Sequence, residues 1–160
     1  MKMLVLSDTH HDVVSIEKIL PIINSCDYLV HLGDCNDDIK RLGERIKVKE
    51  IIKVKGNCDF IELRNPTEEI REIGGVKILF THGHRFRVKD DLLELMLYAQ
   101  EKDCKYVFYG HTHEPKTDER YGITFINPGT LSSTSNWYGQ SYCVVEIENG
   151  KIFSNIVFMG

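Results

Sequence analysis

The stretch MLVLSDTH, residues 3–10, opens the chain with an apolar, β-prone run that turns polar at its end. The apolar residues that follow it recur at helical spacing, at Val13, Ile16, Leu20 and Ile23. A strand, a polar loop and a helix in this order predict the first unit of a parallel βαβ sheet. The polar residues would then stand at the carboxyl end of the first strand.

Segments farther along extend this pattern. Short strands are expected at residues 28–30 and 48–54, and each runs into a polar turn that contains glycine. After Pro66 the pattern changes, because the pair Gly74-Gly75 lies inside an extended stretch from 69 to 80. That pair predicts a hairpin, so this part of the chain is expected to be antiparallel.

The second half of the chain is expected to be mostly β after one helix. Residues 90–101 carry an apolar stripe at helical spacing, and a strand is expected at 106–109. Tyr121-Gly122 and Asn149-Gly150 indicate further hairpin turns. Residues 127–140 are rich in Ser, Thr, Gly and Asn and predict a loop that could border a site.

Composition is that of an ordinary soluble globular protein. With 160 residues, 42% of them hydrophobic and 28% charged, one domain over residues 1–160 is expected. The net charge of −4 gives no basic field, so nucleic acid is not an expected partner, although it stays open as a substrate. The five cysteines form no C-x-x-C pair, and the opening apolar run is too short for a signal peptide, which predicts a cytoplasmic protein with reduced thiols.

Five short polar motifs stand where apolar strands are expected to end: Asp8-Thr9-His10, Gly33-Asp34, Gly56-Asn57-Cys58-Asp59, Thr81-His82-Gly83-His84 and Gly110-His111-Thr112-His113. Ligands of open α/β sheets bind beyond the carboxyl ends of the strands, so we expect these motifs to converge in space. The pairs Asp8/His10 and His111/His113 have an i, i+2 spacing. In an extended backbone this spacing puts both side chains on the same side, where they can bind one ion.

The ligand types in these motifs are mixed. Oxygen and imidazole ligands together suit Mn, Fe, Co, Ni or Zn, whereas an all-oxygen set would suit Mg or Ca. A carboxylate can bridge two cations about 3.5–4 Å apart, and Asp34 is the candidate bridge. Two divalent ions offset by Asp8, Asp34 and one hydroxide leave the cluster at about +1, which would attract a phosphate anion.

In this order the motifs resemble those of the calcineurin-like metallophosphoesterase superfamily: D-x-H, G-D, G-N-H-[DE], a lone His and G-H-x-H. The match runs from Asp8 to His113, and the added block Asn127-Pro128-Gly129-Thr130 resembles the small prokaryotic phosphodiesterase subfamily. The resemblance implies an α/β fold, a four-layer αββα sandwich of two mixed β-sheets flanked by helices. It also implies the ligands of each ion: Asp8, His10, Asp34 and His113 for the first, and Asp34, Asn57, His82 and His111 for the second.

The expected activity is hydrolysis of a small phosphate ester. A metal-bridging hydroxide would attack phosphorus in line, so Asp34, Asn57 and His82 are expected to act on the reaction through the activated water. Only the resemblance leads us to expect a phosphodiester substrate rather than a phosphomonoester. Manganese is the first expectation for the two divalent ions, with Ni, Zn, Fe or Co as alternatives.

One position departs from the family pattern. Cys58 stands where many members have a His that contacts the substrate, so the leaving-group acid is unassigned. For Cys58 a role as small filler near the metals is favoured over a role as a site thiol. Asp59 is expected to pack behind the ligands, and His84 either does the same or faces the substrate.

Two other functions stay open at this stage. The retromer subunit shares the fold of the resembled family and is a non-catalytic scaffold that binds proteins; here, however, every ligand position holds a competent residue. A regulatory protein that binds a phosphorylated small molecule would bind tightly without turnover. No membrane partner is expected, and strand edges in the hairpin-rich last third leave a homodimer open.

Overall fold

The computed structural model describes residues 1–61, 63–134 and 137–160. The strands of the first sheet are β1 (Lys2–Leu6), β2 (Tyr28–His31), β3 (Glu50–Lys53), β9 (Ser141–Glu148) and β10 (Lys151–Phe158). Those of the second are β4 (Glu68–Ile73), β5 (Val76–Thr81), β6 (Tyr106–Phe108), β7 (Lys116–Arg120) and β8 (Ile123–Asn127). Their order is β10-β9-β1-β2-β3 in one sheet and β4-β5-β6-β8-β7 in the other.

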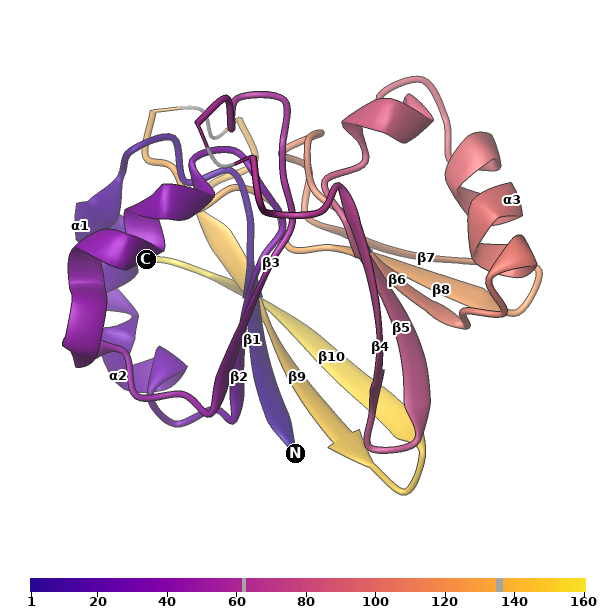
Figure 1. Cartoon of the computed structure of the whole chain (residues 1–160), viewed down its shortest axis with the longest axis horizontal. Helices are drawn as coiled ribbons and strands as arrows, with labels where there is room; N and C mark the ends of the chain where they lie inside the picture. Colours follow the sequence, from indigo (N-terminus) through magenta and orange to yellow (C-terminus); the bar gives the residue numbers. More distant parts are fainter. Residues whose placement is uncertain (62, 135–136) are drawn as a thin grey trace.

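The two sheets pack on each other, and helices cover their outer faces (Figure 1). The first sheet is covered by α1 (Val13–Lys18), α2 (Leu20–Ile23) and the 3-10 helix η1 (Asn36–Arg45), and the second by α3 (Leu93–Glu101). The expected αββα sandwich of two mixed sheets is therefore confirmed. None of the helices in the described part of the chain combines the length and apolar content that crossing a membrane requires.

Side chains on the central strands point alternately to the two faces of each sheet, and this alternation produces the layers. Val5 and Phe80, from different sheets, belong to the core between the sheets. Leu4 and Leu6 on β1 point the other way and pack with the helices of the first sheet, and Leu79 on β5 packs with α3. Because neighbouring residues of a strand point to opposite faces, fully apolar strands can serve two cores at once.

Several element boundaries differ from the sequence expectation. The apolar repeat after β1 forms two short helices, because Pro21 stands in the first turn of α2 and lacks the N–H that a continuous helix would need. The helix expected from residue 90 begins at Leu93, and the strand expected over residues 48–54 is limited to Glu50–Lys53. The hairpin at Gly74-Gly75 is confirmed, with φ of 59° and 76° at the two glycines.

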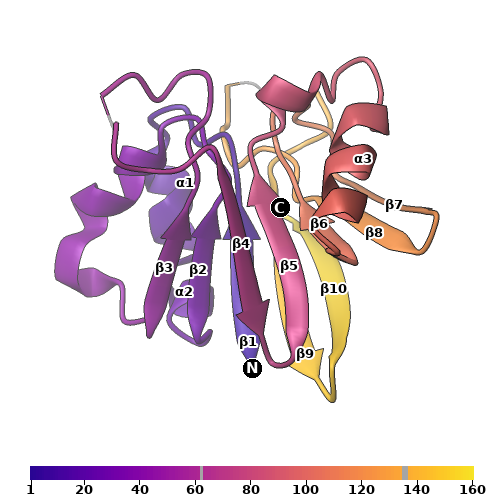
Figure 2. The same cartoon turned by 45° about the vertical axis from the view of Figure 1, so that its right-hand side comes forward.

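The parallel strands place the polar motifs at one end of the sandwich. β1, β2 and β3 are parallel to one another in the first sheet, and β5, β6 and β8 are parallel in the second. Figure 2 shows the loops that follow these strands together at one end of the molecule. The loop expected over residues 127–140 joins β8 to β9 at this end, and its residues 135 and 136 lie outside the described residues.

Candidate metal centre

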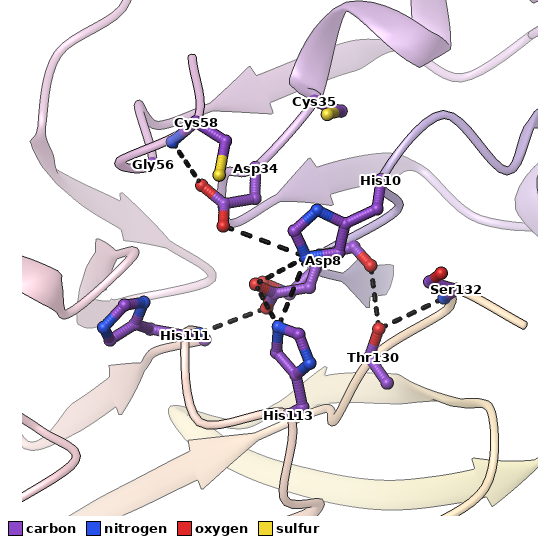
Figure 3. Close-up of polar contacts among 12 residues, drawn as sticks. Asp8, His10, Asp34, Cys35, Gly56, Cys58, His111, His113, Thr130 and Ser132 are labelled. Carbon is purple, nitrogen blue, oxygen red and sulfur yellow. Dashed lines mark hydrogen bonds and ion pairs between the residues drawn. The ribbon is translucent and has the colours of Figure 1, made fainter. Parts of the chain in front are cut away.

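The carboxylate of Asp8 is the point at which three motifs meet. The residue is completely buried at the end of β1. Its Oδ1 atom lies 3.1 Å from His113 Nε2, 3.8 Å from His10 Nε2 and 3.9 Å from His82 Nε2. Figure 3 shows this carboxylate between the imidazoles of His10 and His113. Three ring nitrogens from three separate loops thus converge on one buried anionic oxygen.

The two oxygens of Asp34 face different imidazoles. Oδ2 lies 3.9 Å from His10 Nε2, and Oδ1 lies 3.5 Å from His82 Nε2. The residue is only 3% exposed and follows β2 through the turn at Gly33. This is the arrangement that a carboxylate shared between two cations requires.

The ring of His82 is held in one tautomer. Its Nδ1–H donates to the carbonyl oxygen of Leu32 at 2.8 Å, which leaves the neutral ring with a lone pair at Nε2. That atom lies 3.1 Å from the side-chain oxygen of Asn57. Two acceptors then oppose each other unless a cation or a proton lies between them, so this pair fits a metal ion.

The remaining imidazoles complete two groups of candidate ligands. His10 Nε2 lies 3.3 Å from His113 Nε2, and the ring of His111 lies 5.0 Å from that of His82, centroid to centroid. One group of ligand atoms within 4.8 Å of one another comprises Asp8, His10 and His113, and another comprises Asp34, His82 and His111. With Asn57, which lies 3.1 Å from His82 Nε2, the seven sequence-predicted ligand positions lie near one another; the ions that they would hold stay a prediction.

The electrostatics keep the two carboxylates ionised and His111 neutral, whereas His82 gains affinity for a proton that a metal ion would displace. Burial opposes the ionisation of Asp8 and Asp34, but contacts with His113 and His82 outweigh it and lower the pKa of both carboxyls. Burial also acts against the charged form of His82, yet Asp34 and Asp8 raise its pKa. Burial and the neighbouring His82 lower the pKa of His111 to about 4, so that ring is neutral at pH 7. Ionised carboxylates and neutral imidazoles are the forms that ligate metals.

Backbone strain is concentrated in the same loops. Five of the candidate ligands have left-handed φ angles: Asp8 (54°), His10 (44°), Asp34 (62°), His111 (69°) and His113 (60°). Such angles are uncommon for residues other than glycine and cost about 1–3 kcal/mol each where they are imposed. The surrounding contacts therefore hold the loops in conformations that aim these side chains at one point.

Two glycines allow the loops to approach the carboxylates. A Cβ at Gly56 would overlap Oδ1 and the backbone nitrogen of Asp34, and a Cβ at Gly110 would overlap the Ser7 hydroxyl and crowd Asp8. Neither position tolerates a larger residue without displacing a candidate ligand.

Asp59 and Cys58 contact the turn that carries Asp34. The buried carboxylate of Asp59 accepts three backbone N–H bonds, from Asp34 (2.8 Å), Gly56 (2.7 Å) and Asn36 (3.0 Å). It therefore fixes the loops behind the centre and does not point into it. The backbone N–H of Cys58 donates to Asp34 Oδ1 at 2.8 Å. Partial burial and the charge of Asp34 raise the pKa of the Cys58 thiol to about 11, although its sulfur is within reach of His10 and Asp34 as a ligand atom.

His84 lies beside the imidazoles of the second group. Its ring centroid is 5.3 Å from that of His82 and 6.1 Å from that of His111. Among the residues that the structure describes, its buried Nδ1 atom has no hydrogen-bond partner. Burial lowers the pKa of this imidazole, so the ring is neutral at pH 7 and has one nitrogen available at the edge of the centre.

Three supporting residues were not identified from the sequence. The Ser7 hydroxyl donates to Asp8 Oδ2 at 2.5 Å, and the Thr130 hydroxyl donates to the backbone oxygen of Asp8 at 2.8 Å. His31 is completely buried, and its Nδ1 accepts the backbone N–H of Gly33 at 3.1 Å. The sequence signal for Ser7 was its position next to Asp8. The signal for Thr130 was its place in the Asn-Pro-Gly-Thr block. No sequence signal indicated the role of His31.

Comparison with known proteins places these features in a family. The model of the calcineurin-like phosphoesterase superfamily domain matches residues 1–150. A probable metallophosphoesterase of Methanocaldococcus jannaschii is 33% identical over 130 residues, which are 79% of this chain and 66% of that relative, so the chain spans about two thirds of its length. A phosphodiesterase of the same organism is 31% identical over 152 residues, covering 81% of this chain and 83% of the relative.

Solved structures share the fold over almost the whole chain. A conserved protein of Streptococcus pneumoniae, described as a predicted phosphoesterase, has a TM-score of 0.80 and 30% identity, and the match covers 98% of this chain and 88% of that one. Vps29 of Entamoeba histolytica, solved in complex with zinc, has a TM-score of 0.76 over 98% of both chains. At 24% identity, the likeness to Vps29 shows the fold alone.

Proposed function

We propose that this chain, which belongs to the calcineurin-like phosphoesterase superfamily, is a metal-dependent phosphoesterase that prefers phosphodiesters to phosphomonoesters. The observation that carries the proposal is the pair of buried carboxylates, Asp8 and Asp34, each facing imidazole nitrogens from more than one loop. The relative named a phosphodiesterase supports the order of the two substrate classes. Residues 1–160 would act as one catalytic domain.

Two divalent cations fit the donor set. Asp8, His10, Asp34 and His113 would hold one ion, and Asp34, Asn57, His82 and His111 the other. When bound, such ions would supply a water of lowered pKa as the nucleophile and offset the charge of the phosphate. The mixed oxygen and nitrogen ligands favour Mn first and Ni, Zn, Fe or Co as alternatives.

The protein contributes to this reaction by holding the side chains of the metal ligands in fixed orientations. Asp34 is held from behind by Asp59 and from the side by the Cys58 N–H, so its two oxygens keep fixed directions. His82 is held by the Leu32 carbonyl, which keeps Nε2 aimed at the centre beside Asn57. These constraints place the donors before substrate arrives, which lowers the cost of organising the transition state.

A hydrolysis assay with defined metals tests the proposal. Metal-free protein is given Mn, Ni, Zn or Mg together with p-nitrophenyl phosphate or bis(p-nitrophenyl) phosphate. We expect Mn to restore turnover, with the diester hydrolysed faster than the monoester. Asp34→Asn and His113→Ala should lose about 100-fold or more of kcat/KM, because each removes a metal contact. His11→Ala is the matched control, since its imidazole is largely exposed and belongs to neither ligand set.

Three outcomes separate the candidate functions. Turnover that no metal restores, or that the Asp34 and His113 variants retain, would contradict the catalytic assignment. Tight binding of a phosphorylated compound without turnover would instead favour a regulatory binding protein. Metal binding with neither activity would favour a protein-binding scaffold, a candidate that is supported by the fold shared with Vps29.

A further inference from the structure

A cavity adjoins the candidate metal centre on the His113 side. It has a volume of about 410 Å³ and is lined by Thr112, His113, Trp137 and Tyr138. This volume lies within the range of about 300–1,000 Å³ that is typical of small-molecule sites. Because His113 also contacts Asp8, a molecule with its phosphate at the centre would extend a substituent into this cavity.

The aromatic side chains that line the cavity are exposed without packing against a core. Trp137 is 100% exposed and Tyr138 is 54% exposed. Indole and phenol rings gain much of their binding energy when a flat partner covers them, which is why they are enriched at recognition sites. An uncovered Trp and Tyr beside candidate metal ligands therefore indicate a surface that the substrate covers.

The loop that presents these aromatic residues is anchored by hydrogen bonds on both sides of them, and one of these bonds reaches Asp8. Before them, the Thr130 hydroxyl donates to the Asp8 backbone oxygen at 2.8 Å, and the Ser133 N–H donates to Asp12 at 2.9 Å. After them, the Gln140 side chain donates to the Leu131 carbonyl and to the Ser15 hydroxyl. These bonds fix the position of the loop relative to the first metal motif.

The charge of the lining favours one occupant over others. Among the described residues that line the cavity, none is a carboxylate or a Lys or Arg, so the cavity suits a neutral planar group. A second cavity, of about 240 Å³, lies beside Cys58. Phe60 and Ile61 line it, but so does the carboxyl group of Asp37, which makes it less suitable for the organic part of an anionic ester.

We propose that Trp137 and Tyr138 form a subsite for a planar aromatic substituent of the phosphodiester, either a nucleobase or an aryl ring. This inference rests on the proposed function, because the metal centre positions the phosphate from which the substituent extends. Stacking of one base on an aromatic side chain strengthens binding by about 5- to 150-fold. Trp137 and Tyr138 would thus determine which diesters the centre prefers.

Fluorescence tests the subsite without relying on catalysis. Trp137 is the single tryptophan of the chain, so intrinsic emission reports on this residue alone. Thymidine 5′-monophosphate and phenyl phosphate should quench the emission in a saturable manner, whereas methyl phosphate should not. The two aromatic ligands distinguish a nucleobase from a simple aryl ring. Tyr138→Ala should weaken the apparent affinity about 10-fold, and Tyr121→Ala, which removes an exposed aromatic in the β7–β8 turn, should leave it unchanged.

Kinetics provides the second measurement. Trp137→Ala should lower kcat/KM for thymidine 5′-(p-nitrophenyl phosphate) about 10-fold, mainly through KM, and Trp137→Phe should restore most of it. Because the side chain is fully exposed, neither variant should disturb folding. Unsaturable quenching like that of free tryptophan, or unchanged kinetics in Trp137→Ala, would overturn the subsite while leaving the proposed function standing. Saturable quenching without turnover of any ester would support the subsite and contradict the proposed function.

Discussion

His10 Nε2 lies 3.3 Å from His113 Nε2, although 103 positions separate the two residues in the chain. Both nitrogens also approach Oδ1 of Asp8, at 3.8 Å and 3.1 Å. A neutral imidazole has one nitrogen with a free lone pair, so two rings that face each other across an anionic oxygen suit a shared cation. The contact joins the loops after β1 and β6, which belong to different sheets. A metal ion here would link the two halves of the sandwich.

Metal binding should therefore stabilise the folded protein. A ligand at about 100 times its Kd adds about 2.7 kcal/mol to the free energy of unfolding, which for a chain of this size raises Tm by about 5–10 °C. We expect Mn to raise the Tm of the wild type by this amount in a thermal unfolding scan and EDTA to reverse the shift. Asp8→Asn should abolish most of the shift, whereas Asp90→Asn, at an exposed carboxyl, should retain it. Equal shifts in both variants would count against the ligand assignment.

Removal of the Asp59 carboxylate should destabilise the protein. Its oxygens accept three buried backbone N–H bonds, so Asp59→Ala leaves these donors without their partner. We expect a loss of about 3 kcal/mol or more in the free energy of unfolding, because each buried donor left unpaired costs about 1–3 kcal/mol. Urea denaturation would measure this loss. Asp59→Asn, which keeps one acceptor oxygen, should lose less, and a result equal to that of Asp90→Ala would refute the role of the carboxylate.

Substitution of Gly56 should displace Asp34 and weaken metal binding. The added methyl of Gly56→Ala would occupy space taken by Asp34, so that the carboxylate must move. We expect turnover to fall by about 100-fold, as small displacements of reacting groups commonly cause, and Mn affinity measured by electron paramagnetic resonance to fall as well. Gly122→Ala is the comparison, since φ there is +73° but open space surrounds the new methyl. Gly122→Ala should lower the free energy of unfolding and leave the Mn affinity unchanged.

The stability of the metal-free protein should fall in mild acid because of His31. Burial lowers the pKa of His31 to about 3, from 6.5 in an unstructured chain. Between these two values the unfolded state binds a proton that the folded state does not, so the free energy of unfolding decreases as pH falls from about 6.5 toward 3. The contribution of one such group is at most about 1.4 kcal/mol per pH unit.

Replacing this histidine provides the check. In urea titrations at pH 7, 6, 5 and 4, His31→Gln should show a shallower decline than the wild type, whatever its stability at pH 7. His11→Gln, at an exposed loop position, should decline as steeply as the wild type. If His31→Gln and the wild type decline in parallel, another group dominates the acid response.

The layers and the motif loops could be predicted because local patterns encode them. The apolar run at residues 3–6, the glycine pair at 74–75 and the repeat before α3 each have a period or turn type that specifies one conformation. The polar residues after the strands then had to meet at one end of the sheets. Nothing local indicated that β9 would pair with β1, because β-strand pairing is decided by packing between distant segments.

The contacts that support the metal centre could not be predicted from the sequence either. Asp59 was expected behind the ligands, but its three bonds to the backbone depend on how three loops pack together. His31 lies at the end of β2, and its bond to the Gly33 N–H appears only once the turn is in place. The left-handed φ at Asp34 is likewise imposed by tertiary contacts, since local preference opposes it.

The position of β1 has a consequence for biosynthesis. This strand, which leads to Asp8, lies between β2 and β9, and its residues Lys2 to Val5 pair with Glu146 to Cys143. On the ribosome, β1 emerges well before β9 and cannot gain this neighbour until about 140 further residues have been made. Although β1 can pair with β2 early, its other edge stays open for that time, a period in which chaperones commonly protect such segments. Assembly of the first metal motif would thus be a late event in the life of each new molecule.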